Sequence, residues 1–93
     1  MSRKRLTPWT KKTERHQSLR ENITVWNRTL YLARGHINVR VEKDYRKKYS
    51  VRFIQYKSMK DLLGSDIGGF TKDTQREAKL QATKQMRRWI NVR

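Results

Sequence analysis

Apolar residues in the first third of the chain recur at spacings of three and four. The stripe consists of Leu19, Ile23, Trp26, Leu30 and Ala33. These steps place all five side chains on one face of a helix. Ser18-Leu19-Arg20-Glu21 has the form of a capping box before the stripe, and Gly35 stands where a left-handed helix end belongs. The pattern therefore predicts a helix through residues 23–33.

The same segment also fits a strand. Ile23-Thr24-Val25-Trp26 is rich in residues that favour strands, and Gly35-His36 has the composition of a tight hairpin turn. The helix is the favoured interpretation of residues 23–33, and the strand stays open as the alternative.

From His36 onward the hydrophobic period changes to two. Two sets of alternating apolar residues lie on either side of a polar turn: Ile37, Val39 and Val41, then Tyr49, Val51 and Phe53. This alternation predicts two half-buried strands. For both sets to face one core, Val41 must lie opposite Val51 or Tyr49. That parity requires a loop of three or five residues, because a slip of one residue would turn every side chain to the other face.

Residues 58–70 have no clear period. Gly64 interrupts the apolar residues, and Gly68-Gly69 is typical of a turn or a bulge. A short third strand that ends near Phe70 fits this stretch, and so does a loop.

The C-terminal segment predicts a helix from about residue 74 to residue 91. Thr74-Gln75-Arg76-Glu77 forms a second capping box, and Asp73 adds negative charge at the positive end of the helix. The apolar stripe consists of Ala78, Ala82, Met86 and Trp89. Its two small residues allow the helix to approach a sheet closely.

These elements predict a single α+β domain over residues 18–93, with a small antiparallel sheet of two to three strands. The sheet packs against the C-terminal helix, and an additional N-terminal helix completes the fold. Residues 1–17 are basic and carry only two sizeable apolar side chains, Leu6 and Trp9, so we expect a flexible basic arm there. The alternative is a solvated tail that aids solubility. Trp9 would anchor the arm or stack on a base.

Charge narrows the choice of partner. The chain has 24 Lys and Arg against 8 Asp and Glu, which gives a formal net charge of +16. Such a charge destabilises a small domain through self-repulsion unless a polyanion binds it. Nucleic acid is the expected polyanion, because each neutralised phosphate releases condensed counterions. No apolar run reaches the roughly 18 residues of a membrane span, so we expect no membrane partner.

Composition also bears on location and chemistry. The chain has no cysteine, and no apolar region typical of a secretion signal follows its basic N-terminus. We expect a cytoplasmic protein, associated with the nucleoid if it binds DNA. The two histidines, His16 and His36, have no patterned carboxylates beside them, and Gly68-Gly69 lacks the Lys-Ser/Thr ending of a phosphate-binding loop. We therefore expect no enzymatic activity, no metal and no cofactor.

The candidate nucleic-acid-binding residues fall into four groups. They are Arg3, Lys4 and Arg5 in the arm; Asn38, Arg40, Arg52 and Tyr56 on the outward strand face; Arg46, Lys47 and Lys48 in the turn; and Lys72, Arg76 and Lys79 at the helix start. Arginine and asparagine make bidentate contacts to guanine and adenine edges, whereas tyrosine stacks on unpaired bases. The turn and the helix start would bind phosphates.

A purely structural interpretation stands beside this one. Arg40 and Arg52 would pair with acids across the ladder, and Glu42 and Asp44 are the only acids close enough in sequence. The basic residues at the helix start would then be a solvated helix face.

The strands and the final helix resemble the arm-binding domains of tyrosine integrases and related three-stranded DNA-binding domains. The resemblance is carried by His36–Asp44, Tyr49–Lys57, Gly69-Phe70-Thr71-Lys72 and Arg76-Glu77-Ala78. In that family a junction similar to G-F-x-T-x-x-E-A leads from the strands into the helix, and the insertion at residues 59–67 departs from it. The resemblance implies a sheet in the major groove, with Asn38, Arg40 and Arg52 as base readers.

Residues 18–91 also resemble the double-stranded-RNA-binding domain, whose order is helix, three strands, helix. Arg76-Glu77-Ala78-Lys79 with Ala82 is similar to the basic helix start of that family. This resemblance implies phosphate contacts from Arg76 and Lys79. Phe70 and Lys72 stand where that family has small residues, which is a departure from its pattern.

The sequence therefore predicts a small basic protein that binds duplex DNA through an outward sheet face and an N-terminal arm. By analogy, its role would be accessory or regulatory, as in proteins of phages and other mobile elements. One alternative is an RNA-binding protein, which binds double-stranded RNA or is associated with the ribosome. The other is a basic inhibitor or adaptor that binds an acidic protein surface. An exposed apolar patch containing Trp9 or Leu80 would favour the adaptor, and a basic sheet face would favour nucleic acid.

Overall fold

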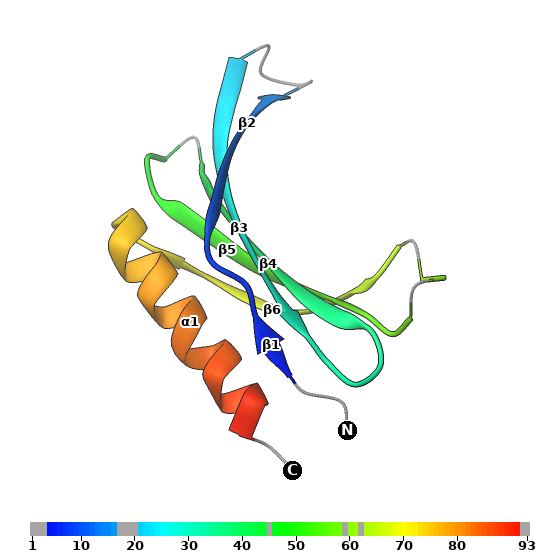
Figure 1. The fold of residues 1–93 in the computed structure, drawn as a ribbon. Coiled ribbons are helices and arrows are strands. Elements are labelled where there is room, and N and C mark those ends of the chain that lie inside the picture. The colour runs from blue at the N-terminus through cyan, green and yellow to red at the C-terminus, as the bar shows by residue number, and fades with distance from the viewer. Residues whose placement is uncertain (1–3, 17–20, 45, 59, 62, 92–93) are drawn as a thin grey trace.

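A computed structural model describes residues 4–16, 21–44, 46–58, 60–61 and 63–91. In this part of the chain, six strands form one antiparallel sheet and one helix follows them (Figure 1). The strands are β1 (Arg5–Leu6), β2 (Thr10–His16), β3 (Glu21–Tyr31), β4 (His36–Lys43), β5 (Tyr49–Tyr56) and β6 (Ser65–Lys72); the helix is α1 (Gln75–Asn91).

From β2 onward the sheet is a meander in which consecutive strands lie side by side. Its order is β1-β3-β4-β5-β6, and β2 also pairs with β3, so β1 and β2 together form one edge of the sheet. The helix α1 lies across one face of the sheet (Figure 1). We call the other face the open face.

The core lies between α1 and the sheet. It consists of Trp26 and Leu30 on β3; Ile37, Val39 and Val41 on β4; Val51 and Phe53 on β5; and Ala78, Ala82 and Met86 on α1. The two alanines are fully buried, so the α1 backbone comes close to the strands. Burial of a side chain such as Leu30 or Met86 stabilises the fold by about 1.5–3 kcal/mol.

The predicted fold of two to three strands with an N-terminal helix is wrong. Residues 23–33 are not a helix, since β3 covers Glu21–Tyr31 and pairs with strands on both sides. Trp26 and Leu30 are four residues apart, and this spacing puts two side chains on one face of a helix and also on one face of a strand. The β-branched residues around them decide for the strand, because they fit a pleated sheet better than a helix.

The open alternative for this segment is the one that the structure has. Gly35 has a φ of 77°, which glycine adopts without steric cost, and Leu32 N donates to Gly35 O at 3.1 Å. This turn joins β3 to β4 as a hairpin. Of the proposed first capping box, residues 18–20 lie outside the described residues, and Glu21 begins β3.

The N-terminal segment belongs to the sheet instead of standing apart as a flexible basic arm. Arg5 pairs with Tyr31, and Thr10 pairs with Asn27, so β1 and β2 lie along one edge of β3. The side chains of Leu6 and Trp9 pack against the core. The segment is ordered because the long strand β3 offers it a row of backbone hydrogen-bond partners.

Two other predictions are confirmed, and one segment that was left open is a strand. Val41 lies opposite Val51, and residues 44–48 form the five-residue loop that the parity argument allows. The C-terminal helix runs over Gln75–Asn91, and its cap is Thr74, whose Oγ1 accepts a hydrogen bond from Glu77 N at 3.1 Å. Residues 65–72 form the strand β6. A strand was one of the two interpretations of that stretch, and a loop was the other.

Candidate nucleic-acid interface

A groove runs between α1 and the sheet edge that β1 and β2 form. It consists of two neighbouring hollows of about 250 and 370 Å³. The first is lined by Trp9, Arg76, Lys79, Leu80 and Thr83, and the second by Leu6, Arg28, Arg87, Ile90 and Asn91. We call these residues together the α1 groove.

A second stripe of α1 forms one wall of this groove. It consists of Arg76, Leu80, Thr83, Arg87 and Ile90, at spacings of four, three, four and three. It flanks the buried stripe of Ala78, Ala82 and Met86, so the helix packs one stripe on the sheet and presents the next to the groove.

Arg28 connects the two hollows. It lies on β3 between the core residues Trp26 and Leu30, and its side chain crosses to α1. Its Nε donates to Thr7 O at 2.6 Å, and its Nη1 donates to Thr83 Oγ1 at 2.9 Å. Burial lowers the pKa of Arg28, and the positive charge of Arg87 lowers it further.

Lys79 is held by aromatic rings and an amide. Its Nζ lies 5.7 Å from the centre of the Trp9 ring and 5.4 Å from that of Trp26. With the Gln75 amide oriented to satisfy its neighbours, its oxygen accepts from Lys79 Nζ at 2.8 Å and from Trp26 Nε1 at 3.1 Å. Burial lowers the pKa of Lys79, and the charge of Lys11 adds to this effect.

The cations in and beside the groove have no acidic partner among the residues that the structure describes. Within the described part of the chain, no carboxylate oxygen lies within 4.0 Å of the charged nitrogens of these five residues: Lys11, Arg28, Arg76, Lys79 and Arg87. Like charges that are partly buried and not neutralised oppose folding. A bound polyanion would remove this repulsion, so the groove is chemically suited to phosphates.

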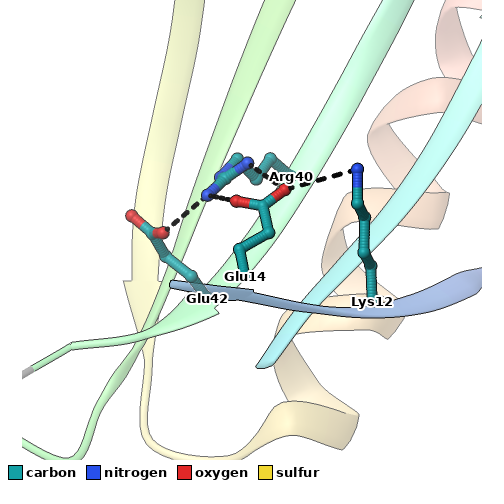
Figure 2. Close-up of polar contacts among 4 residues, drawn as sticks. All are labelled: Lys12, Glu14, Arg40 and Glu42. Carbon is teal, nitrogen blue, oxygen red and sulfur yellow. Dashed lines mark hydrogen bonds and ion pairs between the residues drawn. The ribbon is translucent and has the colours of Figure 1, made fainter. Parts of the chain in front are cut away.

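The open face has the opposite electrostatics. Arg40 Nη2 donates to Glu14 Oε2 at 2.7 Å and to Glu42 Oε2 at 3.3 Å (Figure 2). The Arg40 hydrogen bond lowers the pKa of Glu14. Burial alone would lower the pKa of Arg40, but the hydrogen bonds and charges of Glu14 and Glu42 outweigh it and raise that pKa.

The other predicted readers on the open face also have partners. Arg52 Nε lies 3.7 Å from Asp66 Oδ2, and Asn38 Nδ2 donates to Thr29 Oγ1 at 3.1 Å. The Tyr56 ring stacks on His36, with 4.8 Å between ring centres.

The structural interpretation, in which Arg40 and Arg52 pair with acids, therefore describes their observed geometry. The acidic partners that it named, Glu42 and Asp44, were not the full set. The acids that pair with the two arginines also include Glu14 and Asp66. The sequence did not indicate these two acids, because it did not place both β2 and β6 in the sheet. Glu42 pairs with Arg40 as considered, whereas Asp44 lies 3.9 Å from Arg46.

The predicted residues of the N-terminal segment are spread over several contacts. Arg3 lies outside the described residues. Lys4 Nζ donates to Trp89 O at 3.0 Å and to Ile90 O at 3.4 Å, and therefore caps the C-terminal carbonyls of α1. Arg5 lies over the Tyr31 ring, 5.1 Å from its centre.

The predicted residues of the turn and of the helix start also make separate contacts. Lys47 takes a positive φ of 62° in the turn that also holds Arg46, and Lys48 Nζ lies 3.1 Å from Asp73 Oδ1. Lys72 lies over the Phe70 ring. Of the predicted site residues, Arg76 and Lys79 are the two that the structure brings together in the α1 groove.

Sequence reasoning missed three cations of this region: Lys11, Arg28 and Arg87. The spacing of Arg76, Leu80, Thr83 and Arg87 was a usable signal, since it predicts a second helical stripe. Arg28 could be placed only by reading residues 26–30 as a strand, because a helix turns it away from Trp26 and Leu30.

Comparison with known proteins gives no match, whether with family models, curated proteins or solved structures. The described residues include no helix with the length and apolar character that crossing a membrane requires. Nor do three or more His, Cys, Asp or Glu side chains gather into a metal-binding group among them.

Proposed function

We propose that this protein binds nucleic acid, that its preferred ligand is duplex DNA, and that the α1 groove contacts the phosphates. The observation that carries the proposal is the set of five cations in and beside the groove without a described acidic partner. Each phosphate that these cations neutralise releases counterions condensed on the nucleic acid, and the entropy of that release favours binding. The two Trp9 contacts, with Arg28 and Lys79, hold two of these cations in place before the ligand arrives.

The open face has a secondary part in this proposal. A base edge that bound Arg40 would have to compete with Glu14 and Glu42, which already accept hydrogen bonds from its two terminal nitrogens. The proposal therefore assigns affinity to phosphate contacts in the groove and assigns the Arg40 cluster to stability.

One observation favours a second candidate function, a basic adaptor that binds an acidic protein surface. Leu80 is 56% exposed and lines the same hollow as Trp9. An apolar patch within a ring of cations can accommodate an acidic protein segment as well as a nucleic acid. RNA is the other alternative, since Arg76 and Lys79 are the residues that the RNA-binding interpretation emphasised.

If duplex DNA is the ligand, the protein works in the cytoplasm beside the chromosome or a mobile element, in an accessory role.

The test is a fluorescence-anisotropy titration with matched duplex DNA, duplex RNA and single-stranded DNA of equal length. Five phosphate contacts predict a slope of log K against log salt of about −4.5, which is a loss of about 500-fold between roughly 50 and 200 mM salt. Duplex DNA bound most tightly, with such a slope, supports the proposal. Tighter binding of duplex RNA would identify RNA as the ligand in place of DNA. Absence of salt-dependent binding to all three probes refutes nucleic-acid binding.

A further inference from the structure

The first hollow of the α1 groove has an apolar floor. Leu80 and Trp9 line it together with Thr83, Arg76 and Lys79, and Leu80 is 56% exposed. The Thr83 hydroxyl oxygen already accepts a hydrogen bond from Arg28. Arg76 and Lys79 can donate to phosphates at this hollow, but Leu80 offers a phosphate no hydrogen bond, so it suits a different group of the ligand.

The size and surroundings of the hollow restrict that group. Its volume of about 250 Å³ lies below the roughly 300–1,000 Å³ of typical small-molecule sites, so it suits one ring system and not a whole cofactor. Arg76 and Lys79 stand at its margin, and Arg28 lies between it and the second hollow. Among the residues that the structure describes, no carboxylate lines either hollow. The complementary ligand is a flat apolar group with negative charge on both sides.

We propose that the Trp9–Leu80 hollow takes an unpaired base of the nucleic acid whose phosphates the α1 groove holds. A base flanked by its own two phosphates has the required chemistry, and contacts between bases and apolar or aromatic side chains tolerate any base. This inference rests on the proposed function and narrows its substrate to duplexes that contain an unpaired base or a junction with a single strand.

Contacts with the rest of the fold hold Trp9 in position in the hollow. Arg28 and Lys79 each lie 5.7 Å from the centre of the Trp9 ring, and Trp9 packs against the core between β1 and β2. A site that is already ordered loses little conformational entropy when the ligand binds.

The test compares a fully paired DNA duplex with the same duplex carrying one unpaired central base. The variants are Leu80→Ala and, as a matched control, Leu63→Ala, because Leu63 is 92% exposed and lies outside the groove. We expect the natural protein to prefer the interrupted duplex about tenfold. Leu80→Ala should lose most of that preference for the interrupted duplex, and Leu63→Ala should bind both duplexes as the natural protein does.

A second readout uses a fluorescent adenine analogue as the unpaired base. Its emission should change on binding to the natural protein and to the Leu63 variant, and much less with Leu80→Ala. Equal affinity for both duplexes, or the same behaviour of both variants, overturns the base site and leaves phosphate binding intact. Absence of binding to either duplex overturns the proposed function itself. Leu80-dependent binding of polyglutamate that is tighter than that of the interrupted duplex assigns the hollow to an acidic polypeptide and also overturns the base site.

Discussion

Arg40 on β4 reaches across β3 to Glu14 on β2, and the two side chains form a bidentate ion pair of 2.7 and 3.3 Å (Figure 2). Glu14 lies opposite Ile23 of β3, and Arg40 lies opposite Asn27 of the same strand. The pair therefore joins two strands that share no backbone ladder and fastens the edge of the sheet to its centre. An arginine used in this way contributes to the fold.

Replacing Glu14 by glutamine should lower stability near neutral pH by about 1 kcal/mol, since both side chains are partly exposed. The folded-state pKa of Glu14 lies below its ordinary value of 4.5, so its contribution to stability is present above that pH and is lost as pH falls through the lowered pKa. Thermal unfolding followed by circular dichroism should therefore show a gap between the two proteins at neutral pH that narrows below 4.5.

The control for this experiment is Asp66→Asn. The Asp66–Arg52 pair is 3.7 Å long and mostly exposed on both sides, so we expect no measurable change. A gap for Glu14→Gln that stayed constant down to acidic pH would contradict the role given to its charge.

Gly35→Ala should destabilise the protein by at least about 2 kcal/mol. The residue has a φ of 77°, and a Cβ there would collide with the backbone oxygen of Tyr56. Urea unfolding measures the loss. Gly68→Ala is the comparison, because its Cβ would meet nothing within 4 Å and only the backbone strain remains. Equal losses at both sites would show that the close approach of the β3–β4 turn to β5 is not important.

Deleting residues 1–12 should lower the melting temperature markedly. The deletion removes β1, the start of β2 and the packing of Leu6 and Trp9 against the core. A flexible arm would predict the opposite, an unchanged melting temperature with only a weaker dependence of binding on salt. Calorimetry of the shortened chain distinguishes these outcomes, and an unchanged transition would mean that the edge strands add nothing to stability.

The strands β4 and β5 and the start of α1 could be predicted because each of them has its own local sequence pattern. The alternation from Ile37 to Phe53 gives two strands and their register, and the cap at Thr74 gives the start of α1. Thr10–His16 could not be predicted, since TKKTERH has no apolar alternation and becomes a strand only beside the long edge of β3. Tertiary pairing overrides local propensity there.

The candidate site was predictable only in part for the same reason. Arg76 and Lys79 belong to one helix start and were named from the sequence. Arg28 reaches the groove from β3, and its partner Thr83 is 55 residues away. The acid that occupies Arg40 is likewise 26 residues distant, and only the pairing of β2 with β3 brings it close.

The salt dependence of DNA binding by two charge variants tests the central claim most directly. One variant carries Arg76→Gln and Arg87→Gln in the α1 groove. The other carries Lys57→Gln and Lys60→Gln in the loop before β6, which removes the same charge elsewhere. We expect the groove variant to lose about two units of slope in log K against log salt and the loop variant to lose none. Equal losses in both variants would mean that net charge alone binds DNA and that the α1 groove is not the site.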